Sequence, residues 1–137
     1  MSNVLSNLRK KRGFPVVIDD DTFHVRSLTY GELLRIDSLF QSPPASASET
    51  PEQFEFRIRQ SFRKSAYMVG CALCSSELGG QQLPRNENET AVEWADRIIT
   101  EFEEVESDKI RLLSEAVGKL SQGNRGKPVS LETMVKN

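Results

Sequence analysis

The stretch FPVVIDDDTFHVRSLTYGELLRID, residues 14–37, carries the clearest local structural signals of the chain. Two runs rich in β-forming residues flank three aspartates, which predicts a β-hairpin with a short loop over 14–26. Thr29 and Glu32 then form the T-x-x-E pattern of a capping box, so a helix over about 30–41 is expected. Because an isolated hairpin is only marginally stable in water, we expect this hairpin to pack on the apolar side of the helices.

The first predicted helix is amphipathic, and a linker rich in Pro, Ser and Ala follows it at 42–49. Leu28 before the cap and Leu33 within the helix suit a hydrophobic staple. The buried stripe of this helix is expected to contain Leu33, Ile36 and Phe40, broadened by Leu34 and Leu39.

A second, longer helix is predicted from residue 51 to about residue 75. Thr50 occupies the N-cap, Pro51 the first helical position and Gln53 the third, which together favour a helix start. At about 100° per residue, the apolar side chains of this helix fall on two nearly opposite faces. We assign one face to the core, with Phe54, Ile58, Phe62, Val69 and Leu73.

The opposite face of this helix carries Phe56, Tyr67 and Cys74, with Arg63 between them. A helix that is apolar on two faces is either sandwiched within the fold or presents one face to a partner, and the sequence leaves both interpretations open. If the face is free, Phe56, Arg63 and Tyr67 are the candidate partner-binding residues. Phe56→Asp would then abolish binding without unfolding the domain, whereas Phe62→Asp would unfold it by burying a charge.

A third helix is predicted after a connector at 76–89, in which residues 78–81 form a small turn or a second hairpin. Thr90 and Glu93 form another capping box. Trp94, the only tryptophan, lies on the apolar stripe of this helix, so we place it in the core.

The acidic stretch 101–106 opposes the dipole at the end of the third helix, which predicts a break near Val105. Ser107 is expected to cap a fourth helix, and Gly123 to stop it. The buried stripe of this last helix is expected to contain Ile110, Leu113, Val117 and Leu120.

Together these elements predict a mainly α protein of the α+β class, with about four helices and an N-terminal β-hairpin packed on them. We expect a flexible basic tail at 1–13, a single helical domain at 14–122 with the hairpin at 14–26, and a weakly ordered tail at 123–137. A chain of 137 residues is long enough for one domain with a substantial core.

Composition narrows the classes of function. The formal net charge is −2, which argues against a dedicated nucleic-acid binder. We interpret the basic residues at 9–12 as part of a solvated tail, with contact to nucleic acid or to an acidic partner as the alternative. No run approaches the roughly eighteen apolar residues of a membrane span, and no apolar segment follows the basic residues as in a signal peptide. A cytosolic protein is therefore expected.

His24 is the only histidine available for catalysis or metal binding. It lies in a strand-like alternation in which Phe23 and Val25 face inward. We therefore expect His24 to face solvent together with Thr22 and Arg26.

The remaining candidate motifs have simple structural interpretations. Cys71 and Cys74 form a single CxxC, which alone cannot complete a tetrahedral zinc site, and we interpret them as two small hydrophobic residues one helical turn apart. Gly79 and Gly80 lack the pattern of a phosphate-binding loop. The aspartates at 19–21 lack EF-hand spacing and suit a turn. We expect no enzyme activity, no cofactor and no metal.

The order of these features resembles the tail assembly chaperones of long-tailed phages. The hairpin followed by RSLTYGEL, residues 26–33, resembles the opening of that family. The segment AYMVGCALCSSELGGQQL, residues 66–83, resembles its helix of small residues that runs into a turn. The closing segment AVEWADRIITEFEEVESDKIRLLSEAVGKLS, residues 91–121, resembles its paired helices. The likeness covers about residues 14–121 and includes no catalytic motif.

This resemblance implies a chaperone that acts in the host cell cytoplasm and is not part of the mature virion. The implied partners are the tape-measure protein, the tail-tube subunit and further copies of the chain in a homo-oligomer, with no nucleic acid and no membrane. In many such phages a longer form arises by ribosomal frameshifting. Two other functions remain open from the sequence: a small structural component of the tail or baseplate, and a small DNA-binding regulatory protein. The net charge and the absence of a basic recognition helix disfavour the second.

Overall fold

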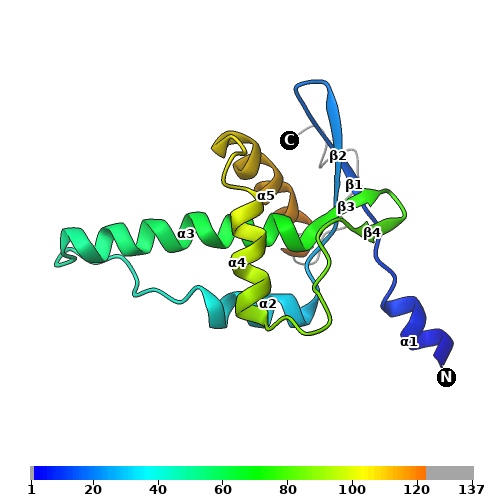
Figure 1. Cartoon of the computed structure of the whole chain (residues 1–137), viewed down its shortest axis with the longest axis horizontal. Coiled ribbons are helices and arrows are strands. Elements are labelled where there is room, and N and C mark those ends of the chain that lie inside the picture. The colour runs from blue at the N-terminus through cyan, green and yellow to red at the C-terminus, as the bar shows by residue number, and fades with distance from the viewer. Residues whose placement is uncertain (1, 123–137) are drawn as a thin grey trace.

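The computed structural model describes residues 2–122 and shows an α+β fold, as predicted. Its elements are α1 (Ser2–Leu8), β1 (Phe14–Ile18), β2 (Asp21–Val25), α2 (Tyr30–Leu39), α3 (Pro51–Ala72), β3 (Leu73–Ser76), β4 (Gly79–Gln81), α4 (Ala91–Glu101) and α5 (Ser107–Gln122). The long helix α3 lies along the longest axis of the molecule, and α2, α4 and α5 gather around its C-terminal half (Figure 1). The four strands form one antiparallel sheet at that end, in the order β1-β2-β3-β4.

Strands β1 and β2 form the predicted N-terminal hairpin. They pair from Phe14 opposite Val25 to Ile18 opposite Asp21. Asp19 and Asp20 make the two-residue loop, and both have positive φ angles of 50° and 69°. A loop with two left-handed residues matches the twist of antiparallel strands, and aspartate tolerates that conformation better than most residues. The prediction of a turn for the aspartate run is confirmed.

A second hairpin, β3–β4, extends the sheet, which settles the alternative left open for residues 78–81. Cys74 pairs with His24, and Leu73 pairs with Val25. The predicted end of the long helix near residue 75 is therefore wrong, because α3 stops at Ala72 and Leu73 takes an extended backbone conformation. Pairing with a strand far away in the sequence overrides the helical pattern here.

Both predicted capping boxes, at Thr29 and Thr90, are confirmed, and the N-cap predicted at Thr50 forms a capping box as well. Thr29, Thr50 and Thr90 each accept a hydrogen bond from the backbone N–H three residues later, and the Glu or Gln at that position accepts one from the backbone of the cap. These bonds satisfy donors that a helix start otherwise leaves without partners. The starts of α2, α3 and α4 are therefore fixed by local sequence.

Helices α3 and α4 also share a longer polar pattern at their starts, E-T-x6-R. Glu49 precedes the cap of α3 and accepts two hydrogen bonds from Arg57, at 3.0 and 3.1 Å. Glu89 precedes the cap of α4 and accepts two from Arg97, at 2.8 and 2.9 Å. Such two-bond pairs have a fixed geometry, so each ties the second helical turn to the residue before the cap.

The core lies where α4 and α5 pack against the C-terminal half of α3 (Figure 1). Trp94 is buried, as predicted, and packs edge-on against Tyr67 at 5.9 Å between ring centroids. Phe40 at the end of α2 packs on Tyr67 at 5.4 Å. A Cβ atom at Gly70 would overlap the side chain of Ile98. Glycine at this position therefore allows α3 and α4 to approach closely.

Parts of the predicted core are wrong. Phe54 and Phe62 are 49% and 66% exposed, because the first half of α3 extends past the other helices (Figure 1). Leu33, expected on the buried stripe of α2, is also exposed. The stripe predicted for α5 is buried or half-buried, with Leu113 and Val117 buried and Ile110 and Leu120 packed against the core.

The structure describes the N-terminal segment from residue 2, and at the other end it describes the chain as far as residue 122. The segment 1–13, expected to be a flexible tail, contains α1, whose side chains from residue 4 onward are exposed. Helix α5 ends at Gln122, beside the predicted stop at Gly123. The tail predicted at 123–137 lies outside the described residues. Within 2–122, no helix has the length and apolar character needed to cross a bilayer.

Candidate protein-binding surface

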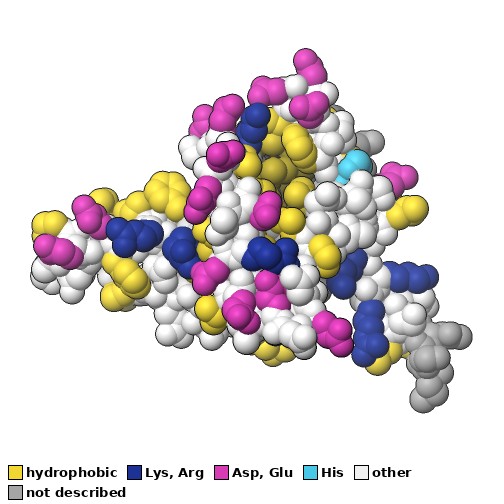
Figure 2. Space-filling model, viewed as in Figure 1, with side chains coloured by type: hydrophobic (Ala, Val, Ile, Leu, Met, Phe, Trp, Pro, Cys, Tyr) yellow, Lys and Arg dark blue, Asp and Glu magenta, His cyan; other side chains and the backbone are white. Residues whose placement is uncertain are grey.

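The first half of α3 projects from the folded body, and we call residues 51–65 the arm (Figure 1). None of these residues is buried. Phe56 is 45% exposed, so the arm carries three exposed phenylalanines together with Phe54 and Phe62. Apolar and charged side chains alternate along its visible surface (Figure 2). Exposed aromatic side chains gathered on one element mark a candidate interaction surface.

The linker that precedes α3 runs beside the arm from the folded body to the tip (Figure 1). Near the tip, Glu49 binds Arg57, and this hydrogen bonding lowers the pKa of the Glu49 carboxyl below its usual value. In the middle, the Gln60 amide donates to the carbonyl of Gln41. At the base, Arg63 forms an ion pair of 3.1 Å with Asp96 of α4. The arm thus has polar contacts at three points along its length, two to the segment between α2 and α3 and one to α4.

The structure separates the three candidate partner-binding residues. Phe56 is exposed on the arm, and Arg63 lies partly exposed at its base. Tyr67 is completely buried, because Phe40 and Trp94 cover it beyond the end of the arm. The expectation of one free face that includes Tyr67 is therefore wrong. The C-terminal half of α3 is sandwiched within the fold, and the N-terminal half is exposed.

Tyr67 has the properties of a packing residue. Burial raises the pKa of its hydroxyl to about 12, and the nearby Cys71 adds to this effect. The hydroxyl has no hydrogen-bond partner among the described residues. At neutral pH Tyr67 is therefore an uncharged aromatic side chain within the core.

The two cysteines are free and buried. Burial raises the pKa of the Cys71 thiol to about 12, with a further contribution from the Glu32 carboxylate, and burial also raises the pKa of Cys74. Because the thiolate is the reactive form of cysteine, neither residue is suited to act as a nucleophile. Cys74 lies on β3, so the two thiols are not on one helix as predicted. Residues 2–122 contain no group of three potential metal ligands.

The main polar centre of the fold is Arg26, which sequence analysis placed in solvent. It lies buried just past the end of β2 and donates to both carboxylate oxygens of Glu32, at 2.9 and 2.8 Å. It also donates to the carbonyl of Cys71 at 2.7 Å and to Oε1 of Gln81 at 3.0 Å. A single side chain therefore connects the sheet, α2 and the end of α3.

The charge of this centre is balanced inside the fold. Burial disfavours ionised Glu32, but the hydrogen bonds from Arg26 and from the backbone of Thr29 outweigh this and lower its pKa below the usual value. One local signal indicates part of this arrangement, the capping box that places Glu32 at the start of α2. Nothing in the local pattern indicated that the same carboxylate also binds Arg26.

Three further features lie outside the arm and the Arg26 centre. The basic residues at 9–12 are exposed, and the Arg12 guanidinium lies 5.5 Å from the centre of the Phe14 ring. His24 was predicted to face solvent, but it is half-buried and pairs with Cys74 of β3. A cavity of about 180 Å³ lies between β1 and α5, lined mainly by apolar side chains such as Val16 and Leu120.

Comparison with models of protein families finds no matching family, and comparisons with curated proteins and with solved structures find no match.

Proposed function

We propose that this protein is a non-catalytic assembly chaperone of a long-tailed phage. It binds the tape-measure protein in the host cytoplasm before tail-tube subunits polymerise around that protein. The observation that carries this proposal is the arm, a helix that projects from the folded body with three exposed phenylalanines. The resemblance in the order of sequence features supplies the identity of the partner.

The physical demands on such a chaperone match an exposed helix. A tape measure is a long helical protein with apolar stripes that promote aggregation. A projecting helix packs its own apolar side chains against such a stripe in the manner of helix-in-groove recognition. Each contact is small, so binding is reversible, and several copies along one partner add avidity.

Phe56 and Arg63 are the residues of the arm that we assign to this contact. Aromatic and arginine side chains are enriched among the residues that dominate binding energy. Phe56 supplies exposed apolar area, and Arg63 supplies a charged group at the edge of the contact. Tyr67 is left out of this assignment because it is buried.

Co-expression with the tape-measure protein of the same phage tests the proposal. We expect this chain to keep the tape measure soluble and to elute with it in gel filtration. Phe56→Asp should abolish co-elution. Leu78→Asp, at an exposed site between β3 and β4, is the matched control and should retain it. Circular dichroism should show both variants folded.

Two results would overturn the proposal. One is a soluble, folded chain that does not bind the tape measure. The other is binding that Phe56→Asp and Leu78→Asp leave equally intact, because the arm would then not be the contact. If the chain does not bind and mass spectrometry finds it in purified virions, the role of a structural tail component replaces the chaperone role.

A further inference from the structure

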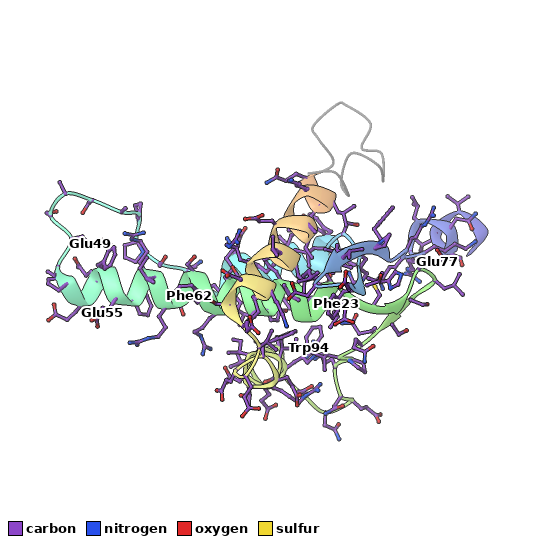
Figure 3. The ribbon with its side chains drawn as sticks, turned by 90° about the horizontal axis from the view of Figure 1, so that it is seen from above. Phe23, Glu49, Glu55, Phe62, Glu77 and Trp94 are labelled. Atoms are coloured by element: carbon purple, nitrogen blue, oxygen red, sulfur yellow. The ribbon has the colours of Figure 1, made fainter. Side chains whose placement is uncertain are left out.

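One side of the arm has a symmetric order of apolar residues. Ile58 is the middle residue of 51–65, and Phe54 and Phe62 lie four residues before and after it. Steps of four residues advance only about 40° around a helix, so the three side chains form one continuous stripe. Phe54 and Phe62 are exposed and Ile58 is half-buried. Phe62 lies at the end of the arm nearest the folded body (Figure 3).

One edge of this stripe is divided by charge. At about 100° per residue, Glu52, Glu55, Arg59 and Arg63 all lie along the same edge. The first two are acidic and belong to the tip half, and the last two are basic and belong to the base half. The opposite edge carries Arg57, which binds Glu49 of the linker.

We infer that two copies of this chain pair through their arms as antiparallel helices, with Ile58 at a twofold axis. Reversal of one arm about Ile58 brings Phe54 of each copy against Phe62 of the other. The twofold axis keeps the charged edges of both helices on the same side. Glu55 of one arm then lies between Arg59 and Arg63 of the second copy. An interface between identical surfaces requires this kind of self-complementarity.

The dimensions of the arm suit this pairing. Residues 51–65 span about 22 Å at the rise of an α-helix. Burial begins at Ala66, so the tip of the second arm ends where the folded body of the first begins. Two short helices bury less surface than a permanent dimer needs, so the pair is a reversible one.

Pairing leaves Phe56 accessible. Phe56 lies about 160° around the helix from the centre of the stripe, on the outer side of each paired arm. The inference does not depend on the proposed chaperone function. Arg63 belongs to both surfaces, so the two are separated by substitutions at Phe56 and Phe62, which lie on different sides of the arm.

Sedimentation of the full chain over a concentration series tests the pairing. We expect a monomer–dimer equilibrium that Phe62→Asp weakens by more than about tenfold. Phe56→Asp is the matched control, with the same change on the opposite side of the arm, and should leave the equilibrium unchanged. Because Phe62 is 66% exposed, its variant should keep the circular dichroism spectrum of the native protein.

Exchanging charges on the edge of the stripe tests the antiparallel direction. Glu55→Arg places like charges opposite Arg59, and Arg59→Glu places like charges opposite Glu55, so each variant alone should dimerise about tenfold more weakly. When the two variants are mixed, opposite charges face each other again, and a heterodimer should form.

A cysteine at the twofold axis tests the register. Ile58→Cys should form an intermolecular disulfide on oxidation, because the residue meets its own copy. Phe56→Cys, on the outer side, should not. The native cysteines are buried, and the pKa of the Cys71 thiol is raised to about 12, so they contribute little to this reaction.

Three results would overturn the inference. The first is a chain that stays monomeric at millimolar concentration. The second is a dimer that Phe62→Asp leaves intact, and the third is a pair of charge variants that do not associate when mixed.

Discussion

The two halves of α3 belong to one continuous helix but lie in opposite surroundings. From Ala66 to Ala72 nearly every residue is buried, and Gly70 allows α4 to approach the backbone. From 51 to 65 no residue is buried, although phenylalanine is frequent there. Apolar content alone therefore does not decide which half joins the core. What decides it is whether elements distant in the sequence reach that part of the helix.

The largest difference between the halves should appear when an aromatic side chain is removed from each. Tyr67→Ala should lower the free energy of unfolding by about 3–5 kcal/mol, because it leaves a cavity between Phe40 and Trp94. Phe62→Ala should change it by no more than about 0.5 kcal/mol. Urea unfolding at low protein concentration, where paired arms dissociate, measures both. Equal losses would mean that the arm is as tightly packed as the core.

Breaking an ion pair should also lower stability more in the folded body than in the arm. Arg26→Met leaves the Glu32 carboxylate buried without its partner and should cost about 3–5 kcal/mol. Arg57→Met breaks the half-buried pair with Glu49 at the surface of the arm and should cost much less, because the Glu49 carboxylate that it leaves can still reach water. Thermal unfolding of the two variants provides the comparison. A similar fall in melting temperature for both would contradict it.

Helices α3 and α4 begin with the same threonine cap, so removing each cap compares the arm with the core. Thr90→Ala removes the cap of α4, which is packed in the core, and should lower global stability by about 1 kcal/mol. Thr50→Ala removes the same cap from the arm and should mainly increase fraying of its first turns. Hydrogen exchange at the amides of the arm distinguishes the outcomes. Global destabilisation by Thr50→Ala would show that the arm unfolds together with the core.

The smallest effect concerns the two glutamates that precede the caps. The hydrogen bonds from Arg97, helped by one from the backbone of Asn86, lower the pKa of Glu89 to about 2. Hydrogen bonding from Arg57 lowers the pKa of Glu49. Since both values are depressed in the folded state, the stability from these pairs is present above the ordinary glutamate pKa and is lost as the pH falls below it. For Glu89 the loss continues down to about pH 2.

Carboxyl titration by NMR measures these values directly. Arg97→Gln should return the pKa of Glu89 toward its ordinary range, and Arg57→Gln should do the same for Glu49. If Arg97→Gln left the pKa of Glu89 near 2, another group would have to hold the charge.

The sequence predicted those features that depend on neighbouring residues. The capping boxes at Thr29 and Thr90, the N-cap at Thr50 and the turn at 19–20 each involve residues within a few positions of one another. They form wherever the chain adopts the local conformation, so the pattern is sufficient to identify them. Trp94 was also placed correctly in the core.

The sequence did not predict features that depend on distant partners. Leu73 and Cys74 follow a helical pattern but pair with β2. Arg26 follows a strand alternation that points to solvent but is buried against Glu32, Cys71 and Gln81. Of the predicted partner-binding residues, Phe56 is exposed, but Tyr67 is buried by side chains from α2 and α4. Helical periodicity gives the direction of a side chain, but not what lies opposite it.

The linker and the arm lie between Phe40 and Tyr67 in the sequence, and these two residues contact each other at the point where the arm meets the folded body. The chain leaves the body at one of these residues and returns at the other. Whole helical turns could therefore be removed from the arm, with a matching cut in the linker, while both ends stay where they are. The length of the arm can thus change without changing the stability of the core. Variants with longer or shorter arms would keep the same body and differ only in how far from it they meet their neighbours.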